Sequence, residues 1–260
     1  MPIAPTDIWS LQGSWNGLLV VMNAAREFGG AIYSLQWGGF EFIDHTDHGR
    51  CLQTAWQLDG NGEGENPTEA GASADMTSSS TVVKSATVAG NALGTTAQLA
   101  YWVPYGGQAT SPHVLSKSVT LNDNMLRHRI VIELADDHKD MFIEGLTGYL
   151  PASFTRWLAF DPAAGTCAEL PAPVGEVTSL LPIIACIADG SKALALYHTG
   201  AAMRYLYGMP EGCPKLDCAW FTVPDAKAGT YSWDAFTAFG TLDQVTAALI
   251  GLVRDHPSQP

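Results

Sequence analysis

Charged residues are scarce in this sequence. They make up 15% of its 260 residues, against roughly 25% in typical soluble chains, while hydrophobic residues make up 47%. A chain of this composition can bury a large core, which excludes wholesale disorder. Its surface must then consist largely of Ser, Thr, Gly, Asn and Gln, and such a surface suits neutral polar ligands.

Basic residues are fewer than acidic ones, 13 against 26, and the net charge is −13. Such a field repels nucleic acid and anionic membranes, so neither is an expected partner. No run reaches the ~18 apolar residues that span a bilayer, since residues 180–187 end at Asp189 and Gly190. Residues 1–5 lack the regions of a signal peptide, and the compartment stays open between cytoplasmic and secreted.

Familiar site motifs are also missing. The sequence has no GxSxG, P-loop, GxGxxG or HExxH pattern, so serine-hydrolase, nucleotide and zincin chemistry have no support, and we expect no cofactor or metal. Its five cysteines form no CxxC pair. Cys213 and Cys218 flank a short loop, and either a disulfide or buried thiols fit them.

Strand-like runs separated by turn signals fill most of the chain. They recur at spacings of roughly 8–15 residues, which is typical of an antiparallel sandwich. Expected strands are residues 18–23, 31–37, 40–43, 51–58, 81–88, 95–103, 115–121, 125–134, 140–147, 180–187, 193–198 and 218–223. Residues 149–161 break the rhythm and are expected to cross over, whereas Thr241 and Gln244 form a capping box before one short C-terminal helix. We predict one all-β domain, 1–260, of jelly-roll or supersandwich type.

The loop at residues 44–50, Asp-His-Thr-Asp-His-Gly-Arg, lies between two expected strands and is the densest polar group. His45 and His48 are candidate general acids or bases. Alternatively, Asp44 and Asp47 cap the turn and the histidines bond to backbone. A metal reading with Glu69 and His198 is weak because the HxH spacing is missing.

Arg50 and Gln53 follow at the start of the next strand. A guanidinium can hold a carboxylate or vicinal hydroxyls, although an internal ion pair with Asp44, Asp47 or Glu69 fits equally well. Gln53 shares one strand face with Gln57, a plausible hydrogen-bonding floor.

The next polar group, Asn66-Pro67-Thr68-Glu69, supplies a carboxylate among small residues. Glycoside cleavage needs two carboxylates about 5 or 6.5–9.5 Å apart, and Asp47 with Glu69 is the candidate pair. Glu69 as a buried partner of Arg50 is the alternative. Trp56 is a candidate surface for stacking on a sugar ring. Tyr149 is expected to be exposed and is a candidate proton donor. His198 ends a strand, where it is expected to face a cleft. Surface placement is expected for His113, His128, His138 and His256.

The strand content, the length and the Asp47–Arg50 loop are similar to those of jelly-roll and supersandwich carbohydrate-active proteins, a resemblance that implies fold and not activity. We predict a glycosidase whose carboxylates are Glu69 and Asp47, with His45, His48 and Tyr149 as further catalytic residues. The expected substrate contacts are Arg50, Gln53, Asn66, Trp56 and His198. One alternative is a lyase with a histidine base, Tyr149 as acid and Arg50 neutralising the substrate carboxylate. Others are a sugar epimerase or mutarotase with a His/Glu pair, and a lectin-like binding module. The expected partner is a saccharide, and a homodimer stays open.

Overall fold

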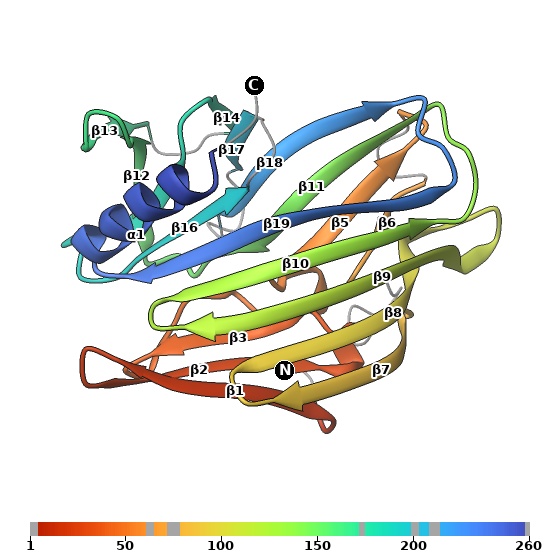
Figure 1. Ribbon diagram of the computed structural model, residues 1–260, viewed down its shortest axis with the longest axis horizontal. Helices are drawn as coiled ribbons and strands as arrows, with labels where there is room; N and C mark the ends of the chain where they lie inside the picture. The colour runs from red at the N-terminus through yellow and green to blue at the C-terminus, as the bar shows by residue number, and fades with distance from the viewer. Residues whose placement is uncertain are drawn as a thin grey trace.

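The computed structural model of the protein describes residues 5–60, 65–71, 79–171, 175–198, 203–207 and 214–257. These residues form two antiparallel sheets and one α-helix, which confirms the predicted all-β sandwich (Figure 1). The smaller sheet has the order β1 (Ile8–Trp15), β2 (Leu18–Ala25), β3 (Ile32–Trp37) and β4 (Phe40–Glu41). Gly38 and Gly39, both with positive φ, make the predicted two-residue turn between β3 and β4.

The larger sheet contains fifteen strands. Its order is β13 (Thr166–Leu170), β12 (Phe154–Asp161), β15 (Ile183–Ile187), β16 (Ala193–His198), β19 (Gly229–Gly240), β10 (Met125–Leu134), β9 (Gln108–Asn122), β8 (Ala92–Tyr105), β6 (Pro67–Thr68), β5 (Gln53–Leu58), β11 (Asp140–Tyr149), β18 (Lys215–Pro224), β17 (Met203–Tyr207) and β14 (Glu176–Ser179). β7 (Val82–Ala89) pairs with β8 beside this path. Two short 3₁₀ turns, η1 (Arg26–Phe28) and η2 (His48–Arg50), interrupt the strands.

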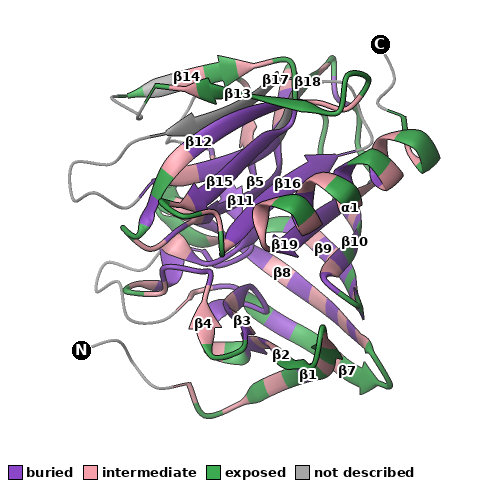
Figure 2. Cartoon of the chain, turned by 90° about the vertical axis from the view of Figure 1, so that its left-hand side faces the viewer, coloured by how far each residue is buried: buried purple, intermediate pink, exposed green. Residues whose placement is uncertain are grey.

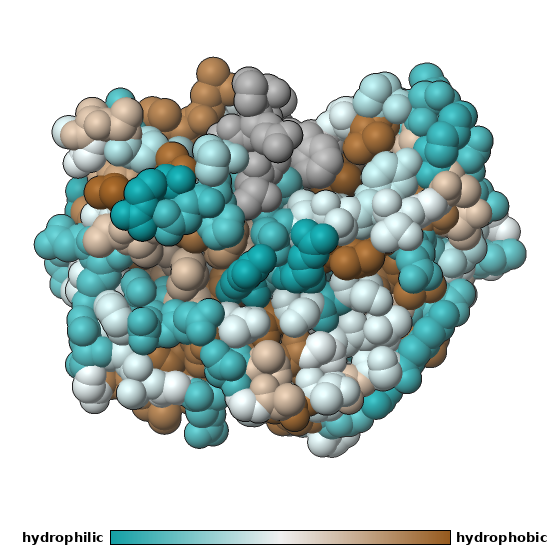
Figure 3. Space-filling model, in the orientation of Figure 1, coloured by the Kyte–Doolittle hydropathy of each residue, from teal (hydrophilic) through white to brown (hydrophobic). Residues whose placement is uncertain are grey.

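Side-chain alternation explains why these segments are strands. In β10, Leu126, Ile130 and Ile132 are buried in the core between the sheets, while Arg127 and Arg129 point outward. Figure 3 shows hydrophilic and neutral side chains across the middle of the face on which β8, β9, β10 and β19 lie. One face of the large sheet therefore packs inward and the other meets solvent, a helix or loops.

Helix α1 (Leu242–Asp255) covers the outward face of β16 and β19 (Figures 1 and 2). The predicted capping box is confirmed, since Gln244 N donates to Thr241 Oγ1 and Thr241 N donates to Gln244 Oε1. Val245, Leu249 and Leu252 pack on a second buried cluster under the helix. No helix among the described residues is long and apolar enough to cross a membrane.

The expected crossover at residues 149–161 is wrong, because Phe154–Asp161 is strand β12, paired with β13 and β15. Phe154 and Trp157 belong to the main core, whereas Leu158 and Phe160 pack under α1. A strand that is buried on both faces loses the period-two alternation by which strands are recognised. The expected strands also leave out β1, β6, β13, β14, β17 and β19.

Candidate functional site

The polar loop at residues 44–50 is organised by Arg50. Its Nη1 lies 2.9 Å from Asp44 Oδ2, and its Nε lies 3.0 Å from Asp47 Oδ2. Asp44 Oδ1 also accepts a bond from Thr46 N at 3.0 Å. The internal ion pair that the sequence left open is present with both Asp44 and Asp47, and it fixes the guanidinium in place. The expected capping role is present for Asp44, whereas the Asp47 side chain makes no cap bond.

Tyr149 at the end of β11 links this loop to β18. Its carbonyl accepts from Asp44 N at 2.8 Å, and the Arg50 guanidinium carbon lies 5.6 Å from the centre of its ring. The register sets Lys215 of β18 opposite Tyr149. Burial is the largest cause of a raised pKa at Tyr149, so the phenol keeps its proton at neutral pH.

Lys215, like Arg50, is a cation that two carboxylates share. Its Nζ lies 3.0 Å from Glu144 Oε2 and 3.4 Å from Asp217 Oδ2. Burial lowers the pKa of Lys215, but Asp217 and Glu144 together raise it further, so the ammonium stays charged. We call the seven residues Asp44, Asp47, Arg50, Glu144, Tyr149, Lys215 and Asp217 the Tyr149 cluster.

The Tyr149 cluster combines fixed proton donors with carboxylate acceptors. Its four carboxylates and two cations give a formal charge of −2, because each cation is shared by two carboxylates. The side chains of Asp47, Arg50 and Lys215 are 18%, 18% and 16% exposed, so they are held in place yet reach solvent. Such a group can bind hydroxyls and move protons.

Gln53, which was predicted to contact substrate, instead holds the loops around the cluster. It is 4% exposed, its Nε2 donates to the Gly49 carbonyl at 2.9 Å, and its Oε1 accepts from Ala70 N at 2.8 Å. His48 is 1% exposed beside Trp102, with ring centres 6.4 Å apart, while His45 is half-buried near Tyr33. His45 is therefore the more accessible of the two.

Glu69 lies in the interior, away from solvent. It is 0% exposed, forms an ion pair with Lys117 of β9 rather than with Arg50, and accepts from Thr54 N at 3.2 Å. The two carboxylates of the predicted glycosidase thus have different environments, since Asp47 reaches solvent and Glu69 does not.

The remaining predicted substrate contacts are either buried or bonded through their backbone. Trp56 is 0% exposed in the core, 6.3 Å from the His113 ring, and His198 is 1% exposed beside Trp233. Asn66 is half-buried, and its carbonyl accepts from Trp102 N at 2.7 Å. Cys213 lies outside the described residues, so the choice between a Cys213–Cys218 disulfide and buried thiols stays open.

Sequence reasoning missed Glu144, Lys215 and Asp217, because strand pairing and not sequence proximity brings them to the loop. The only local signal was the alternation of Lys215, Leu216 and Asp217. Surface placement of three histidines is wrong, since His113 and His128 are 0% exposed and His138 is 9% exposed. Burial lowers the pKa of His128 well below 6.5, and a neutral ring bonded to Thr237 Oγ1 at 3.1 Å is compatible with the core.

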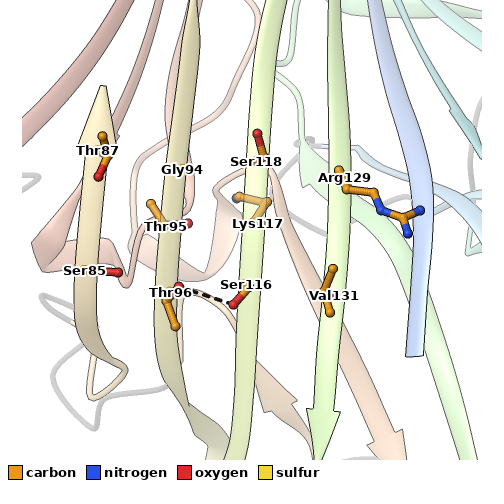
Figure 4. Close-up of a pocket in the computed structure, with 10 residues that line it drawn as sticks. All are labelled: Ser85, Thr87, Gly94, Thr95, Thr96, Ser116, Lys117, Ser118, Arg129 and Val131. Atoms are coloured by element: carbon orange, nitrogen blue, oxygen red, sulfur yellow. Dashed lines mark hydrogen bonds between the residues drawn. The ribbon is translucent and has the colours of Figure 1, made fainter. Parts of the chain in front are cut away.

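A recess separate from the Tyr149 cluster lies on the outward face of β7, β8, β9 and β10 (Figure 4). It has a volume of about 340 Å³ and is lined mostly by hydroxyl side chains, among them Thr96 and Ser116, together with Arg129. No carboxylate is among these lining residues, all of which the structure describes. This groove offers hydrogen bonds but no acid–base pair.

No family model matches the sequence, and no curated protein matches it. A putative aldose 1-epimerase from Escherichia coli K12 matches in structure with a TM-score of 0.53 and 10% identity, over 90% of this chain and 100% of that one. A galactose mutarotase related enzyme from Lactobacillus acidophilus gives 0.52 and 9%, over 91% and 99%. An alpha-galactosidase from Lactobacillus brevis gives 0.54 and 8%, over 92% of this chain and 40% of that one. The chain has a galactose mutarotase-like β-sandwich fold.

Proposed function

We propose that the protein is a sugar epimerase of the mutarotase type, in which the Tyr149 cluster binds a neutral saccharide and transfers protons at its anomeric hydroxyl and ring oxygen. The observation that carries the proposal is one cluster that joins a protonated phenol, two fixed cations and the partly exposed carboxylate of Asp47. Similarity in fold to an aldose epimerase and a mutarotase-related enzyme, over nearly the whole of each chain, supports the same class of reaction.

The proposed reaction needs one base and one acid. Asp47 accepts the proton of the anomeric hydroxyl while Tyr149 donates a proton to the ring oxygen, so that the bond from the anomeric carbon to the ring oxygen breaks and an aldehyde forms. Rotation of the aldehyde and the reverse transfers then close the ring as the other anomer. Arg50 lies against both residues and orients them, and Lys215 holds a sugar hydroxyl.

The charge of the cluster favours neutral sugars. Arg50 and Lys215 are each neutralised by two carboxylates, so a uronate would meet a net negative site. This argues against the lyase alternative, in which Arg50 neutralises the substrate carboxylate. The glycosidase prediction has less support than the epimerase, because the Lys117 ion pair encloses Glu69.

The test is a panel of neutral aldoses and oligosaccharides followed by proton NMR. We expect faster exchange between the anomers of at least one aldose, with no new reducing ends and no unsaturated product. Asp47→Asn and Tyr149→Phe should each slow the exchange by roughly 10²–10⁴-fold. The matched control is Glu133→Gln, an exposed carboxylate on β10 outside the cluster, which should keep the full rate.

Other outcomes would replace the proposal. New reducing ends would mean hydrolysis, and ultraviolet absorbance from an unsaturated product would mean elimination. Saturable binding without either product and without anomer exchange would favour the lectin-like module.

A further inference from the structure

A second group of ionisable side chains lies away from the Tyr149 cluster, on the core side of the large sheet. Glu65 follows β5, His113 lies in β9, and His138 lies between β10 and β11. One ligand atom from each of the three lies within 4.8 Å of the other two, and the residues are 8%, 0% and 9% exposed. Side chains from three separate segments thus converge on one enclosed point.

A hydrogen bond at the Nδ1 atom of each ring fixes the orientation of both imidazoles. Asp59 Oδ2 lies 3.1 Å from His138 Nδ1, and Asp59 Oδ1 accepts from Lys139 N at 2.7 Å. Ala135 N donates to His113 Nδ1 at 3.2 Å. The Nε2 atoms of both rings are buried and have no hydrogen-bond partner among the described residues. A buried polar atom without a partner is costly, so an occupant between the two rings would stabilise them.

The charges around this point favour a cation. Burial is the largest cause of a raised pKa at Glu65; the nearby carboxylates of Asp59 and Asp136 raise it further, and His138 opposes them. Of these carboxylates only Glu65 is buried, since the Asp59 side chain is 33% exposed and Asp136 is exposed, and a proton or a metal ion on Glu65 would relieve its repulsion with the other two. The rings that converge here thus each carry one unpartnered nitrogen, and negative charge is in excess around them.

We propose that the Glu65 carboxylate and the Nε2 atoms of His113 and His138 bind one divalent transition-metal ion of the zinc type. Two histidines and one carboxylate are a known zinc ligand set, with bonds of about 2.0–2.2 Å and donor atoms about 3.4 Å apart. Small side-chain rotations close the present separations to that value. Asp59 then orients His138 from the second layer, as carboxylates do behind zinc-bound histidines.

Binding moves one proton within the His113 ring. Because the Ala135 amide donates to Nδ1 of His113, the neutral ring carries its proton on Nε2. When the metal binds at Nε2, that proton leaves to solvent and Nδ1 takes one up, so that the bond from Ala135 N is lost and His113 binds as a neutral imidazole. The ion would tie the β5–β6 connection to β9 and to the β10–β11 turn. Neither the sequence nor the proposed epimerase reaction assigns this site.

The test uses the full chain, stripped with a chelator and titrated with Zn²⁺ by calorimetry and with Co²⁺ by absorption. We expect one ion per chain, a rise in the unfolding temperature, and cobalt d–d bands without a thiolate charge-transfer band. Glu65→Gln and Asp59→Asn should each weaken affinity by about 10–100-fold. The control His256→Asn removes a histidine at the C-cap of α1 and should bind like the unchanged chain.

Three results would overturn the proposal. These are no binding by the unchanged chain, equal affinity in folded Glu65→Gln, or a thiolate band that places the ion at a cysteine such as the exposed Cys167. If a variant fails to fold, the cobalt spectrum of the unchanged chain still decides.

Discussion

Replacing Lys117 with methionine should destabilise the protein by about 3–5 kcal/mol, because the replacement leaves the Glu69 carboxylate buried without its cation. The two side chains are each 1% exposed, and the only other bond recorded to the Glu69 carboxylate among the described residues comes from Thr54 N. Neither charge can reach water without opening the core between β9 and the β6 loop.

This decrease is large against the total free energy of unfolding of a domain. A domain has about 5–15 kcal/mol of stability, so roughly a fifth or more of it would be lost. The unfolding temperature would fall by about 10 °C at the 2–4 °C per kcal/mol typical of such chains. Glu69→Gln should cost a similar amount, since it leaves Lys117 uncompensated. The double replacement of Lys117 by Met and Glu69 by Leu removes both charges and should return close to the original stability.

Urea unfolding followed by circular dichroism measures the stability of each of the three variants against the unchanged chain. The control is Lys84→Met on the exposed face of β7, which should change stability by no more than about 0.5 kcal/mol. A cost below about 1 kcal/mol for Lys117→Met would refute the reasoning. A stable Glu69→Gln variant that has lost turnover would instead return Glu69 to a catalytic role.

Three further predictions follow from single side chains. Burial holds the pKa of His128 well below 6.5, so the unfolded chain takes up the proton first as the pH falls. The free energy of unfolding should therefore be highest above about pH 6.5 and decrease below it. Urea unfolding of His128→Gln from pH 8 to 5 should show a weaker dependence of this free energy on pH. Gly49→Ala should destabilise the 44–50 loop and weaken saccharide binding, because a Cβ at this position overlaps the Trp102 ring. The control Gly94→Ala places its Cβ in open space and should change neither property. Equal melting curves and equal saccharide affinities for the two variants would contradict this prediction. Thr241→Ala should cost about 1 kcal/mol by losing the cap of α1, seen as a lower urea midpoint at constant slope, and an unchanged midpoint would remove the capping box as a source of stability.

The sequence predicts the fold class because alternation and turns are local signals. The β3–β4 hairpin, strand β10 and the α1 capping box all depend on neighbouring residues, and each is present. Strand β12 escaped prediction because burial on both faces removes alternation.

The candidate site could be predicted only in part, because its residues are joined by pairing between distant strands. The 44–50 loop and Tyr149 were recognised, but Lys215 joins them through the β11–β18 register across 66 positions (from 149 to 215). Likewise the partner of Glu69 is Lys117, 48 residues away, and no local pattern distinguishes it from Arg50.

The most direct test of the proposed function is the rate of anomer exchange in a neutral aldose, measured by two-dimensional exchange NMR with the unchanged chain and with Tyr149→Phe. The account predicts exchange above the uncatalysed rate for the unchanged chain and near the uncatalysed rate for folded Tyr149→Phe. Equal rates for the two chains, or no acceleration of any aldose in the panel, would contradict it.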